Sequence, residues 1–564
     1  MLVAAAACGL FALYLCQSRT APFNSDGAAN VLQGQAIISA NPLLRGWWTS
    51  DVSFYTTELP EYALVTAIRG LCPDVVHLCG ALTYTLTVLL AALVARGGAG
   101  GRAGWCRAGI AAGIMLAPSI LGGTEVFLEN PDHAGTAVPV LLVLLLLRRD
   151  GPGATRWDGW LVPAGACALL TLGLIGDELT LAAATAPLAV VSALRLTAGR
   201  RGRGRLASGG ARRRAPIARA PIASAPIDGA LLAAAVVSVG LARLADLLIR
   251  AAGGFDRRPL GGVTLAPLAA VPGNADVLWR SLLLLFGANN PGAPHTAQTI
   301  KAHVLLVSMA DLHVIGLLLG GAGLAAGTAA VLFRRADRVT QLLVAAIIAI
   351  AAAGVFTTVL RSLSNAHEVA ILLPLAAALA GRLVPEARRR PLPSAGRRAA
   401  CGPGAGLAAL ALGAWLAVCL AELCYAAAWP RTQPAQQAVA DWLSGHGQRE
   451  GLAGYWQADA TTVTSGGRVL VAPITLSAQG GTGAVRPAAD RWESSAAWYQ
   501  PGRRSATFVV AVTGLGAPAG LSPAAVRGRF GRPVAEHRVG QDLIMLYRYN
   551  LLTRLTATAF PGPG

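Results

Sequence analysis

Repeated apolar runs of near-membrane length constrain this chain more than any other feature of its sequence. A helix needs about 20 apolar residues to cross the hydrocarbon core of a bilayer. Only 13% of the 564 residues are charged, whereas a soluble domain has about 25% charged residues. The pattern predicts an all-α polytopic membrane bundle of about eleven transmembrane helices. The runs are residues 1–17, 74–95, 108–122, 134–147, 159–176, 179–195, 229–249, 304–333, 339–360, 368–384 and 404–428.

The arginines indicate how the bundle is oriented. If the N-terminus is cytoplasmic, the inner loops hold 24 arginines, whereas the opposite loops hold 9 basic residues over a greater total length. Cytoplasmic loops carry the excess of positive charge. We therefore expect a multi-pass cell-membrane protein with a cytoplasmic N-terminus. The first run lacks the basic start of a signal peptide, so we count it as a span. An odd number of spans then places residues 429–564 outside.

The chain divides into two predicted domains. Residues 1–428 form the membrane domain, with a long outer loop at 18–73 that contains two interfacial helices. A low-complexity cytoplasmic linker at 195–226 repeats Ala-Pro-Ile and is rich in arginine. Residues 429–564 form a small extracytoplasmic α/β domain. Its predicted strands are "GLAGYW", "RVLVAPITL", "ATFVVAVTG" and "DLIMLYRY", and its predicted helices are "AVADWLSGHG" and "SPAAVRGRFG".

Composition excludes several classes of protein. Lys301 is the only lysine, and the Walker A loop needs a Gly-Lys-Ser/Thr sequence, so the chain is not by itself an ATP-driven pump. None of the nine cysteines forms a Cys-x-x-Cys pair, which argues against a cysteine zinc site and a disulfide scaffold. The basic linker suits anionic lipid, and we expect no nucleic-acid partner.

Acidic and other ionisable residues gather where the predicted spans end on the outer face. Ionisable groups near membrane depth are costly and tend to mark substrate or ion paths. Several also have plain structural explanations: Asp26 and Asp132 suit helix N-caps, and Trp47 and Trp48 suit an aromatic belt. The outer set comprises Asp26, Asp51, Glu58, Glu61, Glu125, Glu129, Asp132, His133, Asp177, Glu178, Arg361, His367 and Glu368.

This set fits sugar transfer from a polyprenyl-phosphate donor. Such transfer needs a base for the acceptor hydroxyl and positive charge for the departing phosphate. We assign the base to Asp26. The predicted substrate-binding residues are Asp51, Glu58, Glu61, Trp47, Trp48, Asp132 and His133. The predicted phosphate-binding residues are Arg361, Arg257, Arg258, Lys301 and His367. A divalent cation is compatible with these acids, but no metal ligand is assigned.

The stretch "NSDGAANVLQGQAIISANPLLRGWW", with Asp26 just after the first span, resembles the GT-C superfamily of integral membrane glycosyltransferases. The similarity is to the protein-mannosyltransferase and aminoarabinose-transferase type, and "SDVSFYTTELPEY" looks like an uncharacterised actinobacterial branch. The resemblance implies a cell-envelope enzyme with Asp26 as its first-loop acid, and a glycan, lipid or protein acceptor. Gly27 stands where the mannosyltransferase branch usually has Glu, and "GWWTSD" does not reproduce the oligosaccharyltransferase Trp-Trp-Asp signature.

Two other readings remain open. A lipid or solute transporter or flippase would carry ionisable residues in mid-span, where the sequence offers Arg243, Asp246, Asp311 and His313. A non-catalytic membrane anchor would serve to display residues 429–564. The clustering of acids at one face favours the enzyme.

Overall fold

The computed structural model describes most of the chain. The described residues are 2–129, 132–150, 158–207, 225–257, 263–289, 297–382, 403–478, 485–513 and 521–556.

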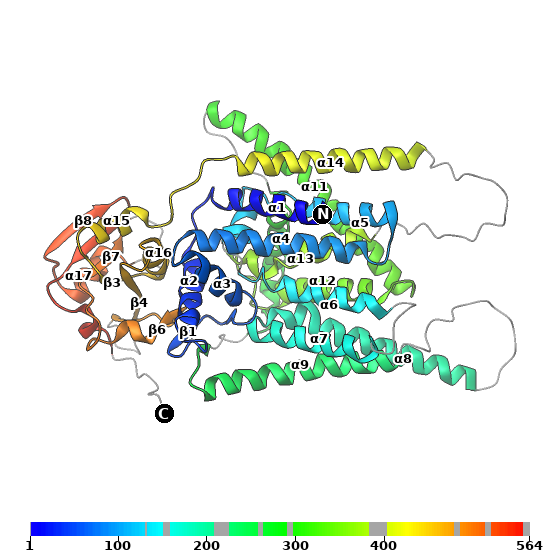
Figure 1. Ribbon diagram of the computed structural model, residues 1–564, viewed down its shortest axis with the longest axis horizontal. Helices are drawn as coiled ribbons and strands as arrows, with labels where there is room; N and C mark the ends of the chain where they lie inside the picture. The colour runs from blue at the N-terminus through cyan, green and yellow to red at the C-terminus, as the bar shows by residue number, and fades with distance from the viewer. Residues whose placement is uncertain are drawn as a thin grey trace.

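A bundle of long helices forms the larger part of the molecule, and a compact region of strands and short helices lies at one end of it (Figure 1). The bundle helices are α1 (Leu2–Ser18), α4 (Asp74–Arg96), α5 (Gly101–Met115), α6 (Ala137–Leu146), α7 (Asp158–Gly176), α8 (Ala186–Ala207), α9 (Ala225–Ala251), α10 (Val271–Leu285), α11 (Ala297–Leu332), α12 (Arg338–Phe356), α13 (Leu372–Gly381) and α14 (Pro403–Ala427). Short helical turns η1 (Glu125–Glu129), η3 (Leu181–Thr185) and η5 (Leu363–Val369) lie between them.

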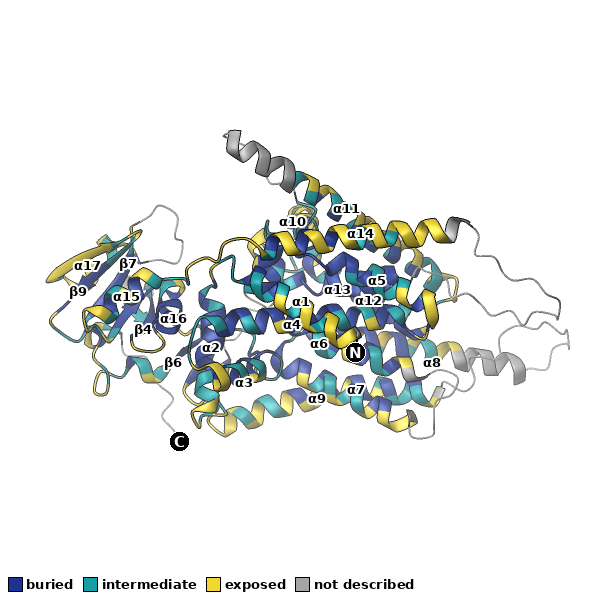
Figure 2. Cartoon of the chain, turned by 45° about the horizontal axis from the view of Figure 1, so that its top comes forward, coloured by how far each residue is buried: buried dark blue, intermediate teal, exposed yellow. Residues whose placement is uncertain are grey.

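Seven helices of the described chain are long and apolar enough to cross a membrane, and an eighth span results if η5 and α13, which are bent by 53°, form one broken crossing. These eight correspond to predicted runs. The runs at 1–17, 108–122 and 134–147 also form helices, but α1, α5 and α6 are shorter. The multi-pass helical architecture is therefore present, while the count of eleven crossings stays a prediction. Apolar residues are exposed along α9 and α14 (Figure 2), as expected for helices that face lipid.

The first outer loop contains the two predicted helices, α2 (Ser25–Ile38) and α3 (Leu59–Arg69). Most of the first ten residues of α2 are buried, so this helix packs inside the protein instead of resting on lipid headgroups. A Cβ on Gly34 would lie 3.0 Å from the backbone of Tyr62 and Ala63. Glycine at this position therefore allows α2 and α3 to cross closely.

The C-terminal region, residues 437–556, contains a six-stranded sheet in the order β5-β4-β3-β7-β9-β8. Side chains alternate between its two faces: Leu452 and Val509 lie in one core cluster, and Ala453 and Val510 in another. Its elements are α15 (Gln437–Gly445), β3 (Glu450–Ala453), α16 (Tyr455–Thr464), β4 (Leu470–Ala478), β5 (Val485–Ala489), β7 (Phe508–Val512), α17 (Pro523–Phe530), β8 (Ala535–Val539) and β9 (Asp542–Leu546).

The predicted strands and helices of this region coincide with β3, β4, β7, β9, α15 and α17, with one error. The stretch "GLAGYW" was predicted to be a strand throughout. The strand ends at Ala453, and Tyr455 is the first residue of α16. Gly454 has the extended backbone that precedes a helix, and the aromatic pair after it therefore begins a helix.

A second, three-stranded sheet joins the C-terminal region to the membrane domain. β1 (Trp47–Thr49) of the first loop pairs in parallel with β2 (Asp256–Arg257) and antiparallel with β6 (Ser494–Ser495). Helix α16 also packs on α2. The C-terminal region is thus attached directly to the loop that carries Asp26.

Candidate functional site

Asp26 is the second residue of α2, so its side chain lies in the first turn of that helix. The N-cap is Asn24, whose side-chain oxygen accepts the amide hydrogen of Gly27 at 3.0 Å. Asp26 is therefore not the N-cap, and the purely structural explanation given for it in the sequence analysis is wrong. Thr136, not Asp132, occupies the N-cap of α6. The Asp26 carboxylate is partly exposed, and its position at a helix N-terminus favours its anion.

Asp26 accepts a hydrogen bond from Asn24 Nδ2 at 3.3 Å, and the C-terminal region supplies another partner. The Tyr455 hydroxyl lies 2.6 Å from Asp26 Oδ1 and 2.6 Å from Glu493 Oε2. Ser25 Oγ also donates to the Tyr455 carbonyl at 2.7 Å, so α2 and α16 share two polar contacts. We call Asp26, Tyr455 and Glu493 the Asp26 chain. It links residues more than 400 positions apart, and sequence inspection gave no signal for it.

Glu493 of this chain and a second acid of the C-terminal region, Asp459, are both buried. Glu493 is 3% exposed, and burial together with the charges of Asp26 and Asp132 raises its pKa well above the usual range. Asp459 is fully buried, and neither of its oxygens has a hydrogen-bond partner among the described residues. Burial and the charges of Asp26 and Asp490 likewise raise the Asp459 pKa. Both groups therefore favour the protonated form.

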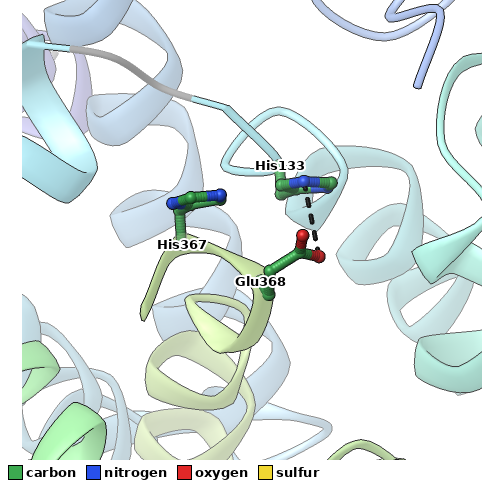
Figure 3. A group of neighbouring side chains, drawn as sticks. All are labelled: His133, His367 and Glu368. Atoms are coloured by element: carbon green, nitrogen blue, oxygen red, sulfur yellow. Dashed lines mark ion pairs between the residues drawn. The ribbon is translucent and has the colours of Figure 1, made fainter. Parts of the chain in front are cut away.

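His133, His367 and Glu368 form a second group, drawn in Figure 3. His133 lies between η1 and α6, and the other two lie on η5. His133 Nε2 is 3.6 Å from Glu368 Oε2, and the rings of His133 and His367 are stacked with centroids 5.6 Å apart. His133 has the left-handed backbone conformation, with φ of 60°. Such strain in a non-glycine residue is more frequent at functional sites than elsewhere.

Asp177 fixes the His133 ring from the opposite side. His133 Nδ1 donates to Asp177 Oδ2 at 2.8 Å, and Thr136 Oγ1 donates to the same oxygen at 2.5 Å. The Leu179 amide donates to the other carboxylate oxygen at 2.8 Å. Burial opposes ionisation, but His133 and these hydrogen bonds hold the pKa of Asp177 below its usual range. Asp177 was placed in the outer set from the sequence but was given no role in the site. We call His133, Asp177, His367 and Glu368 the histidine cluster.

The histidine cluster meets the chemical requirements of a metal site. One ligand atom from each of His133, His367 and Glu368 lies within 4.8 Å of the others. Two imidazoles and one carboxylate are a known zinc ligand set. Metal-bound histidines usually donate their other ring hydrogen to a carboxylate, which is the contact that His133 makes with Asp177. These residues therefore fit a divalent transition-metal ion.

Asp132 connects the two groups. Its charge acts on Glu493 of the Asp26 chain and on His133 of the histidine cluster. The Asp26 chain and the histidine cluster therefore belong to one polar zone, between the membrane helices and the C-terminal region.

The other predicted substrate-binding acids line the same zone to different degrees. Glu58 is 2% exposed, its Oε1 accepts the Gly135 amide hydrogen at 3.1 Å, and burial raises its pKa to about 8. Glu61 accepts a hydrogen bond from Thr83 at 2.7 Å, and burial raises its pKa to about 7. Asp51 is partly exposed, and its charge acts on Glu368.

Trp47 and Trp48 are not available to stack on a sugar. They are 5% and 6% exposed and lie in two different apolar clusters. Trp47 packs edge-on against Trp498, and Arg491 lies over the Trp48 ring. Both rings are buried in the contact between the first loop and the C-terminal region. The predicted substrate contact and the alternative of a lipid-facing belt are therefore both wrong.

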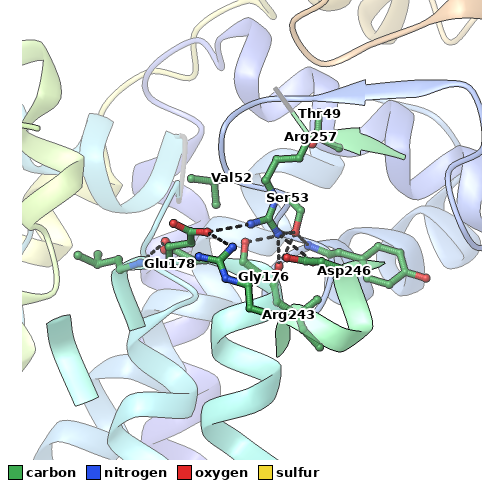
Figure 4. Close-up of polar contacts among 12 residues, drawn as sticks. Thr49, Val52, Ser53, Gly176, Glu178, Arg243, Asp246 and Arg257 are labelled. Carbon is green, nitrogen blue, oxygen red and sulfur yellow. Dashed lines mark hydrogen bonds and ion pairs between the residues drawn. The ribbon is translucent and has the colours of Figure 1, made fainter. Parts of the chain in front are cut away.

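Arg257 already has protein partners (Figure 4). Its guanidinium donates to the Ile175 carbonyl at 2.7 Å and to Ser53 Oγ at 3.2 Å. It also lies 3.5 Å from carboxylate oxygens of Glu178 and Asp246. This buried, neutralised arginine ties β2 to α7 and α9, so its predicted role as a phosphate ligand is not retained.

The remaining predicted phosphate ligands differ in position. Arg361 is exposed just before η5, and its Nε donates to the Thr358 carbonyl at 2.9 Å. Among the described residues, no carboxylate forms an ion pair with it. His367 belongs to the histidine cluster. Lys301 lies in α11, but its side chain is outside the described residues, as is all of Arg258.

Comparisons with known proteins assign no family. No family model matches the chain, and no curated protein matches it. Three solved structures of an oligosaccharyltransferase from Archaeoglobus fulgidus show a weak likeness over 90% of this chain and 69% of that one. The transferase, AglB, with an inhibitory peptide and a dolichol-phosphate gives a TM-score of 0.43 at 13% identity. The form tethered to an acceptor peptide gives 0.42 at 12%, and the apo form 0.45 at 13%. Likeness at this level carries no argument about activity.

Proposed function

We propose that this chain is a membrane glycosyltransferase of the GT-C kind, which moves a sugar from a polyprenyl-phosphate donor to an acceptor hydroxyl at the outer face of the membrane. One observation supports the proposal above the others. A partly exposed carboxylate, Asp26, and a transition-metal ligand set share one polar zone at the end of a bundle of membrane-length helices.

In the proposed reaction Asp26 acts as the general base. The acceptor hydroxyl gives its proton to the Asp26 carboxylate, and its oxygen forms a bond to the anomeric carbon of the sugar. The bond from that carbon to the phosphate oxygen breaks, and the electron pair leaves with polyprenyl phosphate. A positioned base of this kind contributes about 10²- to 10⁴-fold to the rate.

The departing phosphate needs positive charge. Arg361 is exposed and has no ion-pair partner in the described part of the chain, and it stands two residues before η5, which carries His367 and Glu368. Arginine binds phosphate through paired hydrogen bonds. His133, His367 and Glu368 would hold a divalent cation, which would supply further positive charge for the phosphate.

The transporter alternative predicted ionisable residues along a path in mid-span. Three of the four residues that the sequence offered for such a path instead have ion-pair partners within the protein. Arg243 pairs with Glu178 at 3.0 Å, and Asp246 lies near Arg257, both beside the C-terminal end of α7. His313 pairs with Glu422 at 2.9 Å between α11 and α14. This arrangement favours the enzyme.

Mass spectrometry of lipid that co-purifies with the full-length protein tests the proposal. We expect a prenyl-phosphate sugar, and we expect the purified protein to move that sugar to an acceptor. Only bulk phospholipid, together with uptake of labelled sugar into vesicles without a covalent product, would replace the enzyme with a transporter. Recovery of all measurable binding in the isolated C-terminal region would favour the anchor.

A further inference from the structure

The Tyr455 hydroxyl lies between two carboxyl groups but has only one hydrogen to share. Both contacts are 2.6 Å long, which is hydrogen-bond distance for two oxygen atoms. An ionised carboxylate only accepts hydrogen bonds. With both acids ionised, one of these two contacts would bring together two oxygen atoms without a hydrogen between them. The geometry therefore requires a second proton, on either Asp26 or Glu493.

The surroundings of the two acids decide where that proton resides. Asp26 is partly exposed and lies in the first turn of α2, where the helix dipole stabilises an anion. Glu493 is 3% exposed and lies near the charges of Asp26 and Asp132. Ionising a buried carboxyl beside other carboxylates is unfavourable. The proton therefore belongs on Glu493, which donates to the Tyr455 oxygen while Tyr455 donates to Asp26.

We propose that Tyr455 is a positioning residue for Asp26, and that Glu493 is its protonated partner in an acid–phenol–carboxylate chain crossing from the C-terminal region to the first loop. The assignment of Asp26 as base rests on the proposed function; the proton arrangement does not. A fixed phenol holds one oxygen of Asp26 in a single direction, and a neutral Glu493 keeps a second negative charge away from the base.

The backbone around Glu493 supports the proposal that the fold places this side chain next to Tyr455 and Asp26. Glu493 directly precedes β6, whose pairing with β1 attaches the C-terminal region to the first loop. Its φ of 48° is left-handed, a conformation that costs energy for a residue with a side chain. Tyr455 begins α16, which packs on α2. Docking of the C-terminal region therefore places both partners against Asp26.

Infrared difference spectroscopy of the full-length protein at neutral pH tests the proton without any need for activity. A protonated carboxylic acid has a carbonyl stretch separate from that of a carboxylate. We expect Glu493→Gln to remove one such band and Tyr455→Phe to shift it, because the acid loses its acceptor. Tyr499→Phe is the matched control: it removes a buried phenol of the same region that donates to the Pro473 carbonyl, and it should leave the band unchanged.

A Glu493→Gln spectrum that retains every acid band of the wild type, or a Tyr455→Phe spectrum in which no acid band moves, would overturn the proposal. Asp459→Asn identifies which acid band comes from Asp459, the neighbouring buried acid. Thermal melting confirms that each variant folds, and Tyr455→Phe, which deletes one oxygen, is informative even where Glu493→Gln does not fold.

Kinetic measurements test whether Tyr455 positions Asp26. Misplacement of a catalytic group by about 1 Å can cost about 10²-fold in rate, so we expect Tyr455→Phe to lower kcat by about 10- to 100-fold with little change in the donor KM. Unchanged kcat with an altered infrared band would refute positioning and keep the proton assignment. An inactive wild type with the predicted bands would refute the proposed function alone.

Discussion

The Asp26 chain and the histidine cluster are assembled in different ways. All members of the histidine cluster belong to the membrane domain, and each lies where a predicted span begins or ends. The Asp26 chain takes only Asp26 from that domain, whereas Tyr455 and Glu493 come from the C-terminal region. The first group therefore depends on packing of helices, and the second on docking between two parts of the chain.

This difference separates two functions within one polar zone. His133 and Asp177 lie in short connections at the ends of packed helices and are joined by a hydrogen bond of 2.8 Å, which suits a metal site. The Asp26 chain is held by a short three-stranded sheet and by the contact of α16 with α2. We infer that loss of docking would disturb the base while leaving the cation site in place. The first three of the following predictions test this division.

The largest expected effect is on catalysis. Asp26→Asn keeps the size of the side chain but removes the base, and we expect sugar transfer to fall by about 10³-fold or more. Cation binding should not change, because Asp26 is outside the histidine cluster. Asp441→Asn, an exposed change on α15, is the control and should retain full transfer. Full activity in Asp26→Asn would end the assignment of the base.

The next effect is on docking. Trp48→Ala opens a cavity in the apolar cluster that Trp48 shares with the C-terminal sheet, and such truncations cost about 3–5 kcal/mol. We expect earlier thermal unfolding and faster proteolysis between the membrane domain and the C-terminal region. Zinc content, measured by elemental analysis after mild dialysis, should stay near that of the wild type. Loss of zinc together with loss of docking would show that the histidine cluster depends on the C-terminal region as much as the Asp26 chain does.

A smaller effect concerns the cation. Asp177→Asn weakens the contact that orients His133, and loss of such outer partners typically lowers metal affinity by about 10- to 100-fold. Competition with a chelator measures the affinity, and His446→Ala, at the residue just after α15, controls for loss of an exposed histidine. We expect His133→Ala to abolish binding. Unaltered affinity in both cluster variants would exclude the metal site.

The smallest effect is on the pH dependence of stability. Burial raises the pKa of Glu61 from 4.5 to about 7, so the folded state binds this proton more tightly than the unfolded state. The resulting stability is present below pH 4.5 and is lost as pH rises towards 7. Glu61→Gln should therefore flatten the decline in melting temperature between pH 5 and 8, with a contribution of about 2 kcal/mol. A decline equal to that of the wild type would contradict this reading.

The sequence was sufficient to predict those site residues that lie next to the ends of apolar runs. Asp26, Asp132, His133 and His367 were found because each follows or precedes an apolar run. Tyr455, Glu493 and Asp459 were not found, since nothing in the local pattern indicates that α16 and β6 dock on a loop more than 400 residues away. Trp47 and Trp48 were misread because exposure depends on that same docking. Arg257 was misread because its acidic partners come from other helices.

A double-mutant cycle on Asp26 and Tyr455 tests the central claim most directly, namely that the C-terminal region completes the site through Asp26. Residues that act through one another give non-additive losses. We expect Tyr455→Phe to reduce transfer strongly in the wild-type background and to add almost nothing in the Asp26→Asn background. Equal fold-losses in both backgrounds would show that Tyr455 acts independently of Asp26 and would contradict the account.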